Sequence, residues 1–197
     1  MSVPLRLVQT AIPGVLIVEP QIHRDDRGWF SESWNEQRFV DGLKALGQSA
    51  PRRFVQDNHS CSKAGVLRGL HYQLPPHAQG KLVRVVRGAA FDVAVDIRRH
   101  SPTFGRWAGT CLSAQNQRQM WIPEGYAHGF LALEDDTHFL YKTTDVYARD
   151  CERSLRWNDP AIGIQWPLAG LNAAPQIAAK DAAAPLLAAA DLPGGGA

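Results

Sequence analysis

The chain has 197 residues and carries 21 Lys and Arg against 19 Asp and Glu, which leaves a formal charge of +2. Its hydrophobic content of 45% and charged content of 20% are ordinary for a globular protein, so a collagen-like, coiled-coil or wholly disordered chain is excluded. The near-balanced charge gives no electrostatic reason to expect a nucleic acid as the partner.

The cysteines and the apolar runs indicate in which cellular compartment the protein resides. Cys61, Cys111 and Cys151 are odd in number and form no CxxC pair, which argues against a disulfide framework and a thiolate zinc site. No stretch approaches the roughly 18 uncharged apolar residues of a membrane span, and the N-terminus has no apolar signal region. We therefore expect a soluble protein of the reducing cytoplasm, with no membrane partner.

Short apolar runs of strand length follow one another along the chain, separated by Gly and Pro. The clearest run is FDVAVDI at residues 91–97, where large apolar residues alternate with Asp and Ala, so that one face of the strand is predicted to be buried. Many short strands favour an all-β sandwich or barrel and leave little room for β-α-β units. In chain order the predicted strands are 14–19, 54–60, 67–73, 81–87, 91–97, 109–113, 119–122, 129–133 and 138–144.

Two segments are predicted to be helical. Residues 36–46 carry apolar side chains at helical spacing, and residues 178–190 are rich in Ala. Pro185 interrupts the second segment, so we expect two short turns there in place of one helix. No internal repeat is present, and we expect one domain over residues 1–192 followed by a disordered tail over 193–197.

Three polar segments stand out from this apolar pattern: QDNHS at 56–60, LRGLHYQ at 67–73 with Lys81 shortly after it, and PEGYAHGF at 123–130. Gln56 and Asn58 share one face of their strand by parity. The segments are far apart in the sequence, and only a closed β fold can bring them to one cavity.

Arg68 and His71 lie in the same predicted strand but have opposite parity. Both side chains can reach one cavity only if the strand is bulged or kinked between them. Gly69 is the residue that would allow such a bulge.

Two of the polar segments also resemble the cupin signatures. Gly65 followed six residues later by His71 fits the opening of the first signature, and PEGYAH, which ends at His128, fits the second. A metal-binding cupin would carry a second His at the position of Gln73, and Gln is a poor ligand for transition metals. We expect no catalytic metal, although an irregular site of His71, His77 and His128 stays open as an alternative.

At finer grain the chain resembles the dTDP-4-dehydrorhamnose 3,5-epimerase family of the cupin superfamily. The resemblance runs over residues 13–192, through DDRGWFSE, FVQDNHSCSKAGVLRGLHYQ, QGKLVRVVRG, FDVAVDIRRHSPTFGRW, WIPEGYAHGF, FLYKTTDVY, LRWNDPAIGIQWP and KDAAAPLL. It implies a jelly-roll homodimer that needs no cofactor. It also implies inversion of C3 and C5 in a dTDP-4-keto-6-deoxy sugar nucleotide, as a step toward dTDP-L-rhamnose.

The resemblance further implies a role for individual residues. His71 corresponds to the catalytic base, Asp181 to the partner of that base, and Tyr141 to the proton donor. Arg27 and Glu32 match residues that bind the nucleotide, across the dimer interface. The residues that match the lining of the sugar and diphosphate site are Gln56, Asn58, Arg68, Lys81, His128, Glu152 and Lys180.

These residue types suit epimerisation beside a ketone, where loss of a proton from C3 or C5 leaves an enolate on O4. The neutral imidazole of His71 can take the proton, and Asp181 would fix its tautomer. The point charge of Lys81 suits the enolate oxygen. Tyr141, on a facing strand, can return a proton to the opposite face of the sugar.

Besides the metal-binding cupin, two rival functions stay open. An epimerase that acts at C3 alone or at C5 alone would use the same base and nucleotide site, so the sequence does not separate it from the 3,5-epimerase. A sugar-binding cupin without catalysis would keep the cavity but would not need His71, Lys81 and Tyr141 together. If Tyr141 is a core residue, Tyr147 is the next candidate for the donor on the same face by parity.

Overall fold

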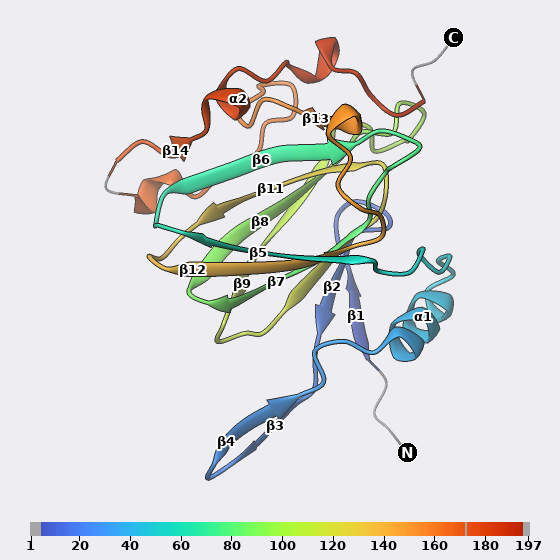
Figure 1. The fold of residues 1–197 in the computed structure, drawn as a ribbon, viewed down its shortest axis with the longest axis vertical. Helices are drawn as coiled ribbons and strands as arrows, with labels where there is room; N and C mark the ends of the chain where they lie inside the picture. Colours follow the sequence, from blue (N-terminus) through green and yellow to red (C-terminus); the bar gives the residue numbers. More distant parts are fainter. Residues whose placement is uncertain (1–4, 172, 195–197) are drawn as a thin grey trace.

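The computed structural model describes residues 5–171 and 173–194 and forms a sandwich of two sheets (Figure 1). The predicted all-β fold is confirmed, and each of the nine predicted strands is present within a few residues of its expected bounds. The strands are β1 Arg6–Gln9, β2 Leu16–Glu19, β3 Ile22–Asp25, β4 Gly28–Ser31, β5 Gln56–Ser62, β6 Val66–Gln73, β7 Lys81–Arg87, β8 Ala89–Asp96, β9 Trp107–Ser113, β10 Gln119–Ile122, β11 Tyr126–Ala132, β12 Thr137–Thr143, β13 Glu152–Ser154 and β14 Gln176–Ile177.

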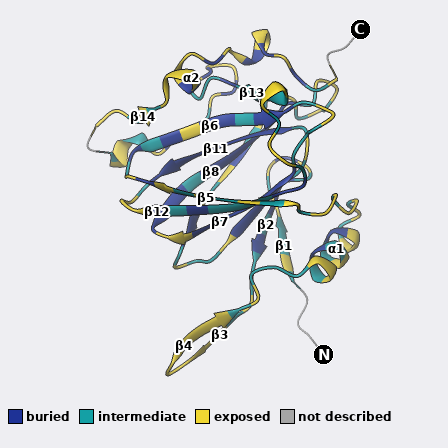
Figure 2. Ribbon diagram, in the orientation of Figure 1, coloured by how far each residue is buried: buried dark blue, intermediate teal, exposed yellow. Residues whose placement is uncertain are grey.

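The two sheets are almost entirely antiparallel. One has the strand order β1-β2-β10-β7-β12-β5, and the other has the order β13-β6-β11-β8-β9. The short strand β14 pairs in parallel with β6. Strands β3 and β4 form a separate hairpin that projects from the sandwich, and Figure 2 shows it exposed along most of its length.

An apolar core fills part of the space between the sheets. It joins Val83 and Phe139 of the first sheet to Ala94 and Phe130 of the second. The rings of Phe130 and Phe139 stack with their centroids 4.0 Å apart. Phe130 also lines the cavity described below, so this core forms one wall of that cavity.

The outer face of the second sheet is covered as well, which corrects one expectation. Residues 91–97 were predicted to bury a single face, yet Asp92 and Ala94 are as fully buried as Val93 and Val95. Val93 and Val95 pack against the C-terminal segment, in a cluster that includes Leu187, whereas Ala94 faces the space between the sheets. The face of this strand that carries Asp92 therefore points into the space between the two sheets.

Both predicted helical segments are confirmed. Helix α1 spans Glu36–Ala45, and its N-terminus is capped by Asn35, whose side chain accepts a hydrogen bond from the Arg38 amide. The Ala-rich segment forms the short helix α2, Ala179–Ala182, and a separate 3-10 turn at Leu187–Ala189. None of the helices in the described ranges has the length and apolar content that crossing a bilayer requires. Pro193 and Gly194 form a turn, and residues 195–197 of the predicted tail lie outside the described residues.

Candidate active site

A bulge in β6 brings Arg68 and His71 to one cavity, as the sequence predicts. His71 pairs with His128 of β11, but Arg68 pairs with Phe130, so β6 has one extra residue between these pairs. Gly69 has a φ of +119°, and a Cβ there would lie 2.6 Å from the Cα of Gly129. The close approach of these two neighbouring strands therefore requires glycine at position 69.

The cavity beside this bulge has a volume of about 440 Å³ and lies between the two sheets. It brings together most of the residues that the family resemblance points to. Those that line it are Asn58, Arg68, His71, Lys81, His128, Tyr141, Glu152, Lys180 and Asp181.

Three predicted site residues lie outside the lining of the cavity. The side chain of Gln56 donates a hydrogen bond to Asn58 and accepts one from the backbone amide of Tyr147, so Gln56 stands beside the cavity. Arg27 pairs with a neighbouring carboxylate on the exposed β3–β4 hairpin. Glu32 accepts hydrogen bonds from two side chains near the start of α1. Within the described chain, Arg27 and Glu32 do not reach the cavity.

His71 and Asp181 form a hydrogen-bonded pair, although 110 positions separate them in the sequence. The His71 Nε2 and the Asp181 Oδ1 are 2.7 Å apart, and Asp181 is 2% exposed. Burial raises the pKa of Asp181, but hydrogen bonds from His71 and from the Gly69 amide outweigh it and hold this pKa below its ordinary value. The ionised carboxylate accepts a hydrogen bond from the Nε2–H group, so the other ring nitrogen of His71 is left without a proton and can act as a base.

A second histidine–aspartate pair lies directly beside the first, since His128 and His71 are paired across β11 and β6. The His128 Nε2 and the Asp92 Oδ1 are 2.7 Å apart, and both residues are buried. The pKa of His128 is lowered by burial, which keeps the imidazole neutral. The other Asp92 oxygen, Oδ2, is buried without a hydrogen-bond partner among the described residues.

Sequence reasoning missed Asp92 as a member of this site. The alternation in residues 91–97 predicts that Asp92 lies on the face opposite the buried valines, whereas in the structure that face points into the space between the two sheets. The one available signal is that Asp in the middle of an otherwise apolar strand needs a partner when it is buried.

Lys81 enters the cavity from β7. Its ammonium is buried and donates a hydrogen bond to the backbone oxygen of His71, at 3.2 Å. Burial lowers the pKa of Lys81 to about 8, although the charges of Asp92 and Glu152 act in the opposite direction. Lys81 is therefore a cation at neutral pH, poorly solvated and free to attract a developing negative charge.

Tyr141 enters the cavity from the sheet opposite that of His71, because β12 and β6 belong to different sheets of the sandwich. Burial raises the pKa of Tyr141, so the phenol keeps its proton at neutral pH. An imidazole that can accept a proton and a phenol that can donate one thus enter the cavity from the two sheets.

Charged side chains surround the rim of the cavity. The guanidinium of Arg68 donates to the Ser62 hydroxyl and the Cys61 backbone oxygen, and no ion pair with a carboxylate is found for it within the described residues. Glu152 and Lys180 form an ion pair at 3.0 Å. Arg68 therefore retains donors for an anionic ligand such as a diphosphate.

The alternative metal site is not assembled from its three histidines. His71 and His128 are each bonded to a buried aspartate through Nε2, and His77 lies against Asp145 at 3.5 Å. Across residues 5–171 and 173–194, no group of three or more His, Cys, Asp or Glu side chains is arranged to hold a metal ion.

Comparison with known proteins assigns the family. The profile of the dTDP-4-dehydrorhamnose 3,5-epimerase family matches residues 9–189. This chain belongs to that family. The dTDP-4-dehydrorhamnose 3,5-epimerase of Salmonella typhimurium is 56% identical to it over 181 residues, which are 92% of this chain and 94% of the relative.

Two solved structures are similar to this chain over most of its length. The dTDP-6-deoxy-D-glucose-3,5-epimerase of Legionella pneumophila, in complex with dTDP-4-keto-L-rhamnose, has a TM-score of 0.88 and 48% identity and covers 98% of this chain and 100% of its own. A 3′-monoepimerase of Streptomyces bikiniensis, in complex with dTDP-quinovose, has a TM-score of 0.79 and 37% identity and covers 90% and 86%. Because the monoepimerase shares the fold, the fold alone does not separate one inversion from two.

Proposed function

We propose that this protein is a dTDP-4-dehydrorhamnose 3,5-epimerase, which converts dTDP-4-dehydro-6-deoxy-D-glucose into dTDP-4-dehydro-L-rhamnose for the synthesis of dTDP-L-rhamnose. The observation that carries the proposal is the meeting of the His71–Asp181 pair, Lys81 and Tyr141 around one cavity. Relatives that are named for this reaction align over nearly the whole chain.

The first half of each inversion is a proton abstraction. The free ring nitrogen of His71 takes the proton from C5 or C3, and the electron pair of the C–H bond moves into the enolate with its charge on O4. Asp181 stabilises the imidazolium that forms. Lys81 places its ammonium against O4, in a buried setting where a charge interaction is stronger than in water.

The second half is reprotonation on the opposite face. Tyr141 gives its phenolic proton to the carbon, while the electron pair of the enolate returns to form the new C–H bond. The imidazolium of His71 then loses its proton to solvent, and the Tyr141 phenolate takes one up. No net proton or electron is consumed, so the chemistry needs no redox cofactor, and we expect the protein to work without a metal ion.

The diphosphate requires cations, and Arg68 is a rim cation for which no ion pair with a carboxylate is found within the described chain. Arg27 and Glu32 bind the nucleotide in this proposal from the partner subunit of a homodimer. The exposed aromatic residues Trp29 and Phe30 on the same hairpin support that arrangement, because large exposed apolar side chains favour an interface. We also propose that residues 1–192 act as one domain and that the enzyme works in the cytoplasm.

Incubation of the 4-keto sugar nucleotide in D₂O tests the proposal. Deuterium at both C3 and C5, with the L-rhamno configuration in the product, is the expected result. Label at one carbon alone identifies a 3-only or a 5-only epimerase. Absence of label, together with intact dTDP binding, contradicts any epimerase and leaves a sugar-binding cupin.

A further inference from the structure

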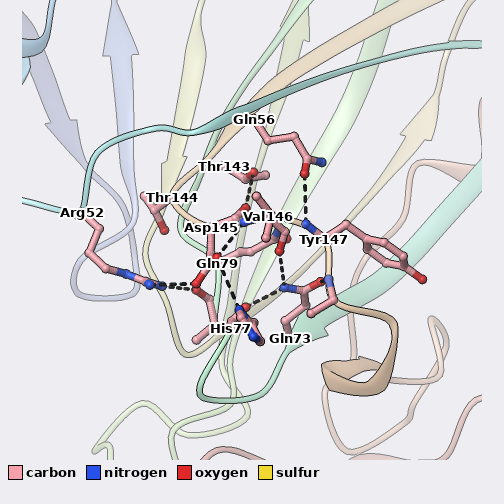
Figure 3. A network of polar contacts seen from close by, with 12 residues as sticks. Arg52, Gln56, Gln73, His77, Gln79, Thr143, Thr144, Asp145, Val146 and Tyr147 are labelled. Atoms are coloured by element: carbon pink, nitrogen blue, oxygen red, sulfur yellow. Dashed lines mark hydrogen bonds and ion pairs between the residues drawn. The ribbon is translucent and has the colours of Figure 1, made fainter.

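The segment Asp145–Ala148, which follows β12, is held from both sheets beside the cavity (Figure 3). The amide of Tyr147 donates to the Gln56 Oε1 at 3.0 Å, and the amide of Ala148 donates to the Gln73 Oε1 at 2.8 Å. Gln56 belongs to β5 and Gln73 to β6, which are strands of opposite sheets. Two carboxamides therefore fix the backbone on either side of Tyr147.

Gln73 uses its whole carboxamide for this purpose. Its side chain is nearly buried, at 6% exposed. The Nε2 group donates to the backbone oxygens of His77, at 2.6 Å, and of Val146, at 3.2 Å, while Oε1 accepts from Ala148. One residue thus satisfies two backbone oxygens and one amide that would otherwise be unpaired beside the cavity.

Tyr147 connects this segment to the charged rim of the cavity. Its hydroxyl donates to the Glu152 Oε2 at 3.1 Å, and the Glu152 Oε1 accepts from Lys180, which directly precedes Asp181. Glu152 is also the residue opposite Gln73 in the pairing of β13 with β6. Gln73 therefore bonds to the backbone on both sides of Tyr147 through its side chain and lies opposite Glu152 in the pairing of β13 with β6.

We propose that Gln73 is a positioning residue, whose carboxamide holds Tyr147 at the rim so that the phenol stays on Glu152 and keeps the Glu152–Lys180 pair at the substrate site. This inference rests on the proposed epimerase function and deepens it. The position where a metal-binding cupin carries a histidine ligand is here occupied by a neutral side chain that donates twice and accepts once. An imidazole does not offer that set of hydrogen bonds.

Amide hydrogen exchange tests, independently of catalysis, whether the Gln73 carboxamide holds the segment around Tyr147. In Gln73→Ala the Ala148 amide loses its acceptor directly, whereas the Tyr147 amide keeps the Gln56 acceptor. If Gln73 holds the whole segment, the Tyr147 amide should exchange about tenfold faster or more, as for one lost hydrogen bond. A Tyr147 amide that exchanges at the parent rate overturns the proposal. Gln73→Glu serves as the second variant if Gln73→Ala does not fold, because it keeps the shape and the acceptor but removes both donors.

Gln119 provides a matched control. It is 4% exposed and its Nε2 donates to the backbone oxygen of Ser33 at 2.8 Å, so it makes the same kind of buried bond outside the lining of the cavity. Gln119→Ala should lower the Tm but leave the exchange of the Tyr147 amide unchanged. Faster exchange of that amide in Gln119→Ala overturns the proposal, because a general loss of stability would then explain the effect.

A double-mutant cycle with Tyr147→Phe tests the catalytic consequence. Each single substitution should lower kcat/KM about tenfold, and the double variant should be no slower than Gln73→Ala alone, because both remove the same contact with Glu152. Fully additive losses overturn the proposal, since Gln73 would then act apart from the Tyr147 hydroxyl. If the unsubstituted protein shows no epimerisation, the proposed function fails. The exchange experiment still decides whether Gln73 positions Tyr147.

Discussion

Discharging the buried Lys81 ammonium is expected to stop the reaction as the pH rises through about 8. Burial lowers the pKa of Lys81 to about 8, so roughly nine-tenths of the protein carries this charge at pH 7 and roughly one-tenth at pH 9. Because the charge stabilises the enolate oxygen in our proposal, kcat should fall about tenfold for each pH unit above 8.

The same pKa difference acts in the opposite direction on stability. The unfolded chain has the ordinary pKa of 10.5 at Lys81, so it holds the proton over a range in which the folded protein has lost it. The contribution of Lys81 to the free energy of unfolding therefore rises with pH between about 8 and 10.5, by about 3 kcal/mol in full. Deprotonation of Lys81 should therefore lower the activity near pH 9 without lowering the Tm.

The assay is kcat from pH 6 to 10, measured by deuterium incorporation, with Tm recorded at each pH. Asp92→Asn removes a negative charge that raises the pKa of Lys81, so the loss of activity should begin at lower pH. Lys142→Gln is the control, because Lys142 pairs with Asp57 on an exposed surface and should leave the profile unchanged.

Two results would refute this reasoning. One is an unsubstituted protein whose activity stays level to pH 10. The other is an Asp92→Asn variant whose loss of activity moves to higher pH, because the carboxylate would then not act on Lys81 through its charge.

Further predictions concern the rim, the acid–base pair, the metal and the bulge. Arg68→Ala should weaken dTDP binding about tenfold or more, because a charge-assisted hydrogen bond contributes roughly 1.5 to 3 kcal/mol. Titration calorimetry measures the loss. Arg84 lies on the opposite face of β7 from Lys81, so the control Arg84→Ala should bind dTDP as the parent does. His71→Ala should abolish deuterium incorporation at every carbon, whereas Tyr141→Phe should still bind dTDP and form about 10²- to 10⁴-fold less epimerised product; product formation at the parent rate would remove Tyr141 as the donor. Activity should survive treatment with a strong chelator, and a loss that a divalent ion restores would contradict the metal-free mechanism. Gly69→Ala should lower the free energy of unfolding, measured in urea, by about 2 to 4 kcal/mol. A smaller loss would show that β6 and β11 can move apart at this point with little cost.

The sequence by itself determined the β architecture and much of the site. Strand length and alternation are local properties, so they located nine strands and helix α1 without any knowledge of their neighbours. The opposite parity of Arg68 and His71 predicts a bulge at Gly69 once both side chains are assigned to one cavity, because side-chain direction along a strand depends only on position. The family resemblance placed His71, Lys81 and Tyr141 in one site, and the structure brings all three to one cavity.

The tertiary structure decided what depends on neighbours. Strands β1, β3, β4, β13 and β14, of two to four residues each, are absent from the predicted strands, and their hydrogen-bonded partners define them. Whether the Asp92 face of β8 was buried depended on the C-terminal segment that covers the opposite face of the sheet. The contact of Asp181 with His71 arises because that same segment returns across β6 after more than a hundred residues. A sequence pattern reports which side of an element is apolar, but only the packing of distant segments determines what lies against each side.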